Sequence, residues 1–132
     1  MAILIIDDDS LLRQTLREML ERLGYQVREA EDGAAGIAEL EAEEPLLVIT
    51  DILMPNKEGI ETIHDIRRLH AALPIIAMSG GGVTGDMSFL EYAGKLGADR
   101  VLRKPIRLHD LETTVRELVP HATDHVPLRL QS

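Results

Sequence analysis

Short apolar runs recur along the chain and end abruptly in polar residues. The runs at residues 3–6, 47–49 and 75–78 are each followed by carboxylate or hydroxyl side chains. A run of this length without a polar interruption is typical of a strand buried on both faces, as in a parallel sheet. The pattern therefore predicts three buried strands, and the strand that ends at Asp51 is the central one.

Two weaker patterns predict further strands. Residues 25–28 alternate apolar and polar side chains, which is typical of a strand at the edge of a sheet. Residues 100–102 form a short segment that leads into Lys104 and Pro105 and predict a fifth strand. The chain is thus expected to contribute five strands to one sheet.

Apolar residues at helical spacing separate the predicted strands. The first such segment follows Asp9 and Ser10, either of which can cap a helix, and stops at Gly24. A second follows Asp32 and runs to about Glu43. A third predicted helix has Ile60, Ile63, Ile66 and Leu69 on one face, and a fourth runs from about Asp86 to Leu96. A fifth has Leu108, Leu111, Val115 and Leu118 on one face and ends before Pro120.

Alternating strands and helices with short connections indicate an α/β protein. Because crossovers between parallel strands are right-handed, the helices should cover both faces of a doubly wound parallel sheet. The 132 residues leave room for one domain, which we expect over residues 1–119. Residues 120–132 show no periodicity and are expected to form a flexible tail or a linker.

Polar side chains stand at the carboxyl ends of the predicted strands. Asp7 and Asp8 follow the first strand, Asp51 ends the central one, and Ser79 and Lys104 follow the fourth and fifth. In open α/β sheets this edge binds ligands, so these side chains should meet there. Clustered carboxylates repel one another unless a cation compensates, and Mg²⁺ prefers oxygen ligands. With a hydroxyl and an ammonium beside them, they predict phosphoryl transfer with Asp51 as the nucleophile.

Charge and composition narrow the range of partners. The formal net charge of -9 and the pI of about 4.9 argue against direct binding to nucleic acid or to an anionic membrane. The absence of cysteine excludes disulfides, thiolate metal sites and thiol nucleophiles. Residues 1–6 are too short for a signal peptide or a membrane span, and we expect a cytoplasmic protein.

The strand-end motifs resemble those of response-regulator receiver domains of two-component signalling. The resemblance extends from Met1 to about Val119. It is carried by Ile3-Leu4-Ile5-Ile6-Asp7-Asp8-Asp9, Val48-Ile49-Thr50-Asp51-Ile52-Leu53-Met54-Pro55 followed by Gly59, Ile76-Ala77-Met78-Ser79-Gly80, and Lys104-Pro105. It implies a flavodoxin-like sheet of strand order 2-1-3-4-5 with five helices.

The same resemblance implies a phosphoacceptor and a metal site. Asp51 would accept the phosphoryl group in the presence of Mg²⁺. Asp8, Asp51 and the backbone carbonyl of Leu53 would bind the ion directly, and Asp7 would act through water. The donor would be a phosphohistidine on a histidine kinase or a histidine phosphotransfer protein.

The resemblance further implies that Ser79 and Lys104 contact the phosphoryl group. The domain would catalyse only its own phosphorylation and dephosphorylation, so it would be a signalling module with an unidentified downstream protein target. A homodimer is left open. Pro105 is expected to follow a cis peptide bond, as in similar domains.

Switching in similar domains repacks the surface around the fourth helix and the fifth strand. The hydroxyl of Ser79 would move toward the phosphoryl group and draw Gly80 and its loop along. The usual aromatic position, three residues before Lys104, is Val101 in this chain. The interval from Ser79 to Lys104 is longer than usual and rich in glycine, which predicts a mobile loop and a displaced fourth helix.

Two positions bear on the lifetime of the phosphorylated form. Leu53 and Gly81 stand where similar domains carry polar side chains that orient the hydrolytic water. Because neither can orient water, we predict a comparatively long-lived phosphorylated form.

A stand-alone signalling module has three alternatives. A receiver excised from a larger regulator or hybrid kinase would carry the same motifs. A Mg²⁺-dependent phosphatase working through an aspartyl phosphate would need a second acid where Leu53 stands, and a substrate cap. A flavin-binding electron carrier would need aromatic stacking residues and a hydroxyl-rich loop in place of residues 7–10.

Overall fold

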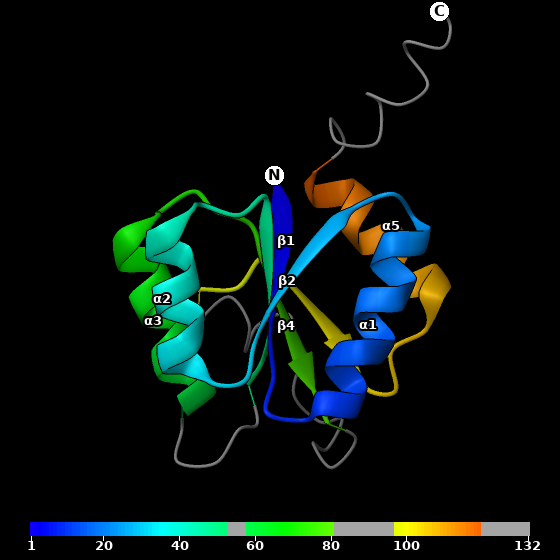
Figure 1. The fold of residues 1–132 in the computed structure, drawn as a ribbon, viewed down its shortest axis with the longest axis horizontal. Helices are drawn as coiled ribbons and strands as arrows, with labels where there is room; N and C mark the ends of the chain where they lie inside the picture. Colours follow the sequence, from blue (N-terminus) through cyan, green and yellow to red (C-terminus); the bar gives the residue numbers. More distant parts are fainter. Residues whose placement is uncertain (53–57, 81–96, 120–132) are drawn as a thin grey trace, which may run out of the picture.

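Five parallel strands form one sheet in the computed structural model of the protein, which describes residues 1–52, 58–80 and 97–119 (Figure 1). The strand order is β2-β1-β3-β4-β5, which confirms the predicted flavodoxin-like, doubly wound topology. The strands are β1 Ala2–Ile6, β2 Gln26–Ala30, β3 Leu47–Asp51, β4 Ile75–Ser79 and β5 Arg100–Arg103.

Helices cover both faces of the sheet. In Figure 1, α2 and α3 lie on one face and α1 and α5 on the other. The helices are α1 Ser10–Arg22, α2 Gly33–Ala42, α3 Glu58–Leu69 and α5 Leu108–Leu118. The helix predicted from about Asp86 to Leu96 and the expected mobile loop lie outside the described residues, so four of the five predicted helices are seen.

The ends of the first two helices follow from local sequence. The carboxylate of Asp9 accepts hydrogen bonds from the backbone N–H groups of Leu11 and Leu12, at 3.0 and 3.2 Å. The carboxylate of Asp32 accepts one from Ala35 N at 2.8 Å. Gly24, just past α1, has a φ of 100°, a conformation that glycine adopts without strain. These caps confirm the predicted helix boundaries.

Two apolar clusters, one on each face of the sheet, form the core. Because side chains alternate along a strand, Leu4 and Ile6 of β1 face α2 and α3, whereas Ile3 and Ile5 face α1 and α5. All residues of β1, β3 and β4 are buried, and β2 mixes exposed and buried positions. The prediction of three buried strands and one edge strand is therefore confirmed.

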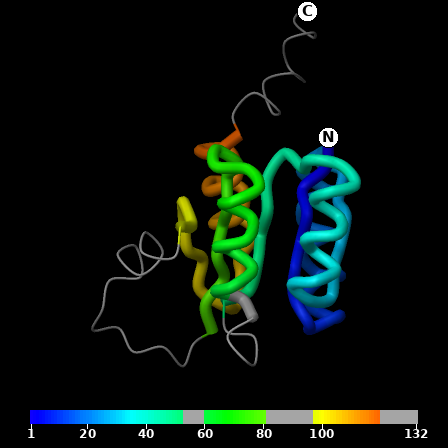
Figure 2. The backbone as a smooth tube through the Cα atoms, turned by 90° about the vertical axis from the view of Figure 1, so that its left-hand side faces the viewer, coloured from blue at the N-terminus to red at the C-terminus, as the bar shows by residue number. Residues whose placement is uncertain are grey.

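Close packing between α2 and the sheet depends on a small residue. Figure 2 shows α2 and α3 side by side over one face of the sheet. A Cβ atom placed on Gly36 of α2 would lie only 2.4 Å from Cδ1 of the fully buried Ile6. The glycine thus lets α2 approach the end of β1, directly before Asp7.

No helix in residues 1–52, 58–80 and 97–119 has the length and apolar character needed to cross a membrane.

All five strands run in the same direction, so their carboxyl ends share one edge of the sheet, the lower edge in Figure 1. The site lies at this edge.

Candidate functional site

Three carboxylates lie together at the carboxyl edge of the sheet. Asp51 is the last residue of β3, and Asp7 and Asp8 directly follow β1. Their side chains offer oxygen atoms that all lie within 4.8 Å of one another. Asp7 is fully buried and Asp51 is 5% exposed, whereas Asp8 faces solvent. The structure therefore brings the adjacent acids Asp7 and Asp8 together with Asp51, which is far from them in the sequence.

Lys104 places its ammonium group between two of these acids. Its Nζ atom lies 3.0 Å from Oδ2 of Asp51 and 3.4 Å from Oδ2 of Asp7. The backbone holds Lys104 in place, because its N–H donates to the carbonyl of Ser79 at 2.8 Å. The Lys104–Pro105 peptide bond is cis, as predicted. The lysine thus extends from the end of β5 across β4 to the acids of β1 and β3.

Burial and charge act in opposite directions on these groups. The pKa of Asp7 is raised above its ordinary value, mainly because burial penalises its charged form, and the charge of Asp51 adds to this. The Asp9 N–H, which donates to Asp7, and the charge of Lys104 oppose the rise. Burial by itself would lower the pKa of Lys104, but the hydrogen bond and charge of Asp51, with the charge of Asp7, outweigh it and raise that pKa.

This donor set fits a hard divalent cation. Asp7, Asp8 and Asp51 offer oxygen ligands only, and the exposed Asp8 leaves one side of the cluster open to solvent. Mg²⁺ prefers oxygen ligands and keeps several of its waters, so a cluster with one solvent-facing member suits it. The three carboxylates carry more negative charge than one ammonium balances, which also favours an added cation.

Of the other predicted site residues, the structure describes Ser79, Gly80 and Val101. Ser79 ends β4 at the same edge, is fully buried, and its hydroxyl donates to the carbonyl of Gly80 at 3.2 Å. Val101 lies in the middle of β5, half-buried against the cluster that faces α2 and α3. Leu53 and Gly81 lie outside the described residues.

Sequence reasoning missed Arg13 and its partner Glu29. The Arg13 guanidinium donates to the backbone carbonyl of Asp7 at 2.7 Å and to the Glu29 carboxylate at 3.0 Å. One signal was available: Arg13 and Arg17 are four residues apart, on one face of α1. Only the packing of α1 against β2 shows that they meet Glu29.

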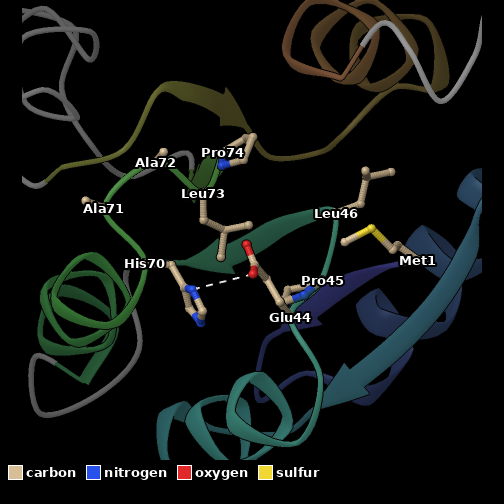
Figure 3. A pocket seen from close by; sticks show the side chains of 9 residues that line it. All are labelled: Met1, Glu44, Pro45, Leu46, His70, Ala71, Ala72, Leu73 and Pro74. Atoms are coloured by element: carbon tan, nitrogen blue, oxygen red, sulfur yellow. Dashed lines mark ion pairs between the residues drawn. The ribbon is translucent and has the colours of Figure 1, made fainter.

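A surface pocket at the opposite edge of the sheet is not part of this site. Figure 3 shows its lining, which comes from the segments just before β1, β3 and β4, where His70 Nδ1 lies 3.7 Å from a carboxylate oxygen of Glu44. Since parallel strands begin at that edge and end at the acids, the pocket and the site lie at opposite ends of the sheet.

A doubly wound parallel sheet of this kind defines a class of α/β proteins that bind their ligands at the carboxyl edge of the sheet, where the acids and the lysine lie. The sequence model of the response regulator receiver domain matches residues 3–116. The chain therefore belongs to the response regulator receiver domain family, and its fold is that of a signalling module.

Relatives with known names support this assignment. The chain is 32% identical over 122 residues to the response regulator MprA of Mycolicibacterium vanbaalenii, covering 92% of this chain and 51% of that protein. It is 30% identical over 118 residues to the alkaline phosphatase synthesis transcriptional regulatory protein PhoP of Bacillus subtilis, covering 89% of this chain and 48% of that protein. The chain thus spans about half the length of these curated relatives.

Solved structures share the whole fold. A response regulator receiver domain protein from Clostridium thermocellum superposes with a TM-score of 0.76 at 29% identity, covering 97% of this chain and 98% of that chain. The chemotaxis protein CheY4 of Vibrio cholerae superposes with a TM-score of 0.79 at 26% identity, covering 89% of this chain and 98% of the other.

Proposed function

We propose that Asp51 accepts a phosphoryl group from a phosphohistidine on a histidine kinase or a histidine phosphotransfer protein. One observation carries the proposal: the nearly buried Asp51 carboxylate lies in a cluster with Asp7 and Asp8, and the Lys104 ammonium is 3.0 Å away. This arrangement surrounds a single nucleophile with groups that can balance the charge of a transferred phosphoryl group. The family membership supports the same role.

In the proposed reaction, an oxygen of the Asp51 carboxylate forms a bond to phosphorus as the phosphorus–nitrogen bond of the donor breaks. The bonding electrons stay with the donor imidazole, which takes up a proton from solvent and leaves as a neutral group. Lys104 orients the Asp51 carboxylate and then the new phosphoryl oxygens, since its ammonium donates to anionic oxygen. Hydrolysis of the acyl phosphate by water returns the Asp51 carboxylate and releases inorganic phosphate.

Asp7, Asp8 and Asp51, with the backbone carbonyl of Leu53, would hold Mg²⁺. When bound, the ion supplies positive charge to the phosphoryl oxygens. Asp7 would act through water, because its two carboxylate oxygens already accept hydrogen bonds from Asp9 N and Lys104 Nζ.

The response of the domain is proposed to start at Ser79 and Gly80. The Ser79 hydroxyl, now donating to the Gly80 carbonyl, would turn to the phosphoryl group and shift the surface that a downstream protein binds. Val101, on the adjacent strand, would take the place of the usual aromatic residue.

We propose that the protein acts in the cytoplasm. We also propose that residues 1–119 form the receiver and residues 120–132 a tail or linker.

The direct test uses acetyl phosphate as a small phosphodonor with Mg²⁺ and measures the intact mass of the chain. Wild type should gain the mass of one phosphoryl group, and Asp51→Asn should gain none. No adduct on wild type, or an equal adduct on both proteins, would contradict the proposal. Asp110→Asn, which changes an exposed acid of α5, is the matched control and should be phosphorylated like wild type.

A further inference from the structure

Arg13 links the acidic site to the neighbouring edge strand. It lies on α1, and its side chain is only 16% exposed. Its Nη1 atom donates to the backbone carbonyl of Asp7 at 2.7 Å, and its Nε atom donates to Oε1 of Glu29 at 3.0 Å. One guanidinium therefore joins the first residue beyond β1 to a carboxylate of β2.

The backbone of Asp7 is held on both of its polar groups. Its N–H donates to the carbonyl of Ala30 in β2 at 3.1 Å, and its carbonyl accepts from Arg13. The next residue, Asp8, is exposed and has left the ladder of the sheet. The direction in which the chain leaves β1, and with it the position of the Asp8 carboxylate, thus depends on this carbonyl.

Arg17 provides a natural comparison one helical turn further along α1. Its Nε atom donates to the other Glu29 oxygen, Oε2, at 2.6 Å, and its Nη2 atom donates to the carbonyl of Val27 at 3.2 Å. Both arginines therefore fasten α1 to β2 through the same carboxylate. The two arginines differ in that Arg13, and not Arg17, donates to the backbone carbonyl of Asp7.

We infer that Arg13 is a positioning residue for the cation site: held by Glu29, it fixes the Asp7 carbonyl so that the carboxylates of Asp7 and Asp8 converge with that of Asp51. This inference rests on the proposed function, because it concerns the metal site described there. Arg13 touches the backbone of the site and no reacting atom.

The sign of the effect separates positioning from simple electrostatics. A guanidinium close to a cation site repels the cation, so if charge alone mattered, removing Arg13 would tighten cation binding. If Arg13 positions the acids, its removal loosens their convergence and weakens binding. Groups that orient metal ligands in this way typically change metal affinity by about tenfold or more.

The test measures Mn²⁺ binding to the full chain by electron paramagnetic resonance, with Mn²⁺ as the probe for the Mg²⁺ site, beside thermal unfolding of each protein. Arg13→Met should weaken Mn²⁺ binding by about tenfold. Arg17→Met, which also loses one bond to Glu29, should bind like wild type. Arg13→Lys should recover part of the affinity, because an ammonium can still donate to the Asp7 carbonyl.

Other results of this experiment would contradict either the positioning role of Arg13 or the metal site itself. Unchanged or tighter binding by Arg13→Met, or equal weakening by Arg17→Met, overturns the positioning role and leaves the proposed function intact. Absence of Mn²⁺ binding by wild type overturns the metal site of the proposed function. Where Arg13→Met fails to fold, Glu29→Met tests the same link, because it removes both oxygens that hold Arg13 and Arg17, and wild-type affinity in that variant overturns the inference.

Discussion

Lys104 is the residue on which the charge balance of the site depends. Its ammonium lies between the carboxylates of Asp51 and Asp7, at 3.0 and 3.4 Å. Burial opposes the charged form of Lys104, but these two carboxylates outweigh it and raise the pKa of the lysine. A fixed ammonium that is already in place needs no reorganisation when a phosphoryl group arrives, which is how preorganised charges favour a reaction.

Replacing Lys104 tests this role directly. Lys104→Gln keeps a hydrogen-bond donor but removes the charge, so the rate of phosphorylation by acetyl phosphate should fall by about a hundredfold. The rate is measured from the growth of the phosphorylated mass with time. Arg103→Gln, which removes the preceding and exposed cation at the end of β5, is the control and should react at the wild-type rate. Equal rates for Lys104→Gln and wild type would contradict the role.

At the residue scale, the sequence identifies which side chains meet but not how each is buried. Asp51 and Lys104 could be assigned to one edge because parallel strands end together. The pattern predicts a helix cap at the end of the run Asp7-Asp8-Asp9, but it does not say that Asp7 is fully buried while Asp8 is exposed. That division depends on contacts from β2 and α1, which are distant in sequence.

At the element scale, the contact between α2 and β1 limits the size of the side chain that position 36 can hold. A methyl group there would meet Cδ1 of Ile6 at 2.4 Å and Cγ1 at 2.9 Å inside a fully buried cluster. Overpacking of this kind outweighs the higher helix propensity of alanine.

Gly36→Ala should therefore lower the free energy of unfolding by about 1 to 2 kcal/mol, measured by urea denaturation. Ile6→Val removes Cδ1, the nearest of the clashing atoms. The double variant should be more stable than the sum of the two single effects predicts, because the smaller side chain makes room for the methyl group. Strict additivity would show that Gly36 and Ile6 do not compete for the same space.

The attachment of α1 to β2 should depend on pH. The pKa of Glu29 is lowered below its ordinary value of 4.5, chiefly by the hydrogen bond from Arg17, with burial opposing and Arg13 assisting. A carboxylate whose pKa is lower in the folded than in the unfolded state stabilises the fold above its unfolded pKa. This stabilisation is lost as the pH falls through the folded pKa.

Glu29→Gln should accordingly cost about 1 kcal/mol of unfolding free energy at neutral pH. The difference from wild type should shrink steadily as the pH falls below the ordinary glutamate value of 4.5. Urea denaturation of both proteins over a series of pH values measures it. A difference that stays constant or widens toward acid would show that the charge of Glu29 does not fasten α1 to β2.

Helix caps at Asp9 and Asp32 could be predicted because a cap is formed by residues that are close in sequence. The link from α1 to β2 through Arg13 and Glu29 could not, because it joins residues 16 positions apart whose meeting is set by packing. The close approach of Gly36 to Ile6 could not be predicted for the same reason, because the local sequence of α2 indicates only an alanine-rich helix.

At the scale of the whole molecule, the order of strands places the site. Apolar runs and helical spacing predict a parallel sheet, and the resemblance to receiver domains supplied the order 2-1-3-4-5 that the structure shows. In this order β1 and β3 are neighbours at the centre of the sheet, so Asp7 and Asp51 lie side by side although 44 positions separate them. The pattern alone does not fix which strands are neighbours.

A cation bound at this edge should stabilise the entire domain. A ligand that binds only the folded chain raises the free energy of unfolding, by about 2.7 kcal/mol at one hundred times its dissociation constant. The melting temperature should therefore rise with Mg²⁺ for wild type and for Asp110→Asn, and should respond weakly for Asp8→Asn. Because Asp8 is exposed, that variant is expected to remain folded. An equal rise in all three would indicate general ionic screening in a chain of net charge -9.

The most direct test of the central claim is to locate the phosphoryl group on the chain. After reaction with acetyl phosphate and Mg²⁺, borohydride reduction converts an aspartyl phosphate to homoserine, and tandem mass spectrometry of the tryptic peptide from Glu29 to Lys57 identifies the modified position. We predict homoserine at position 51 alone and only when Mg²⁺ was present. Homoserine at another position, or none in a chain that carries the phosphoryl mass, would contradict the assignment of Asp51 as the phosphoacceptor.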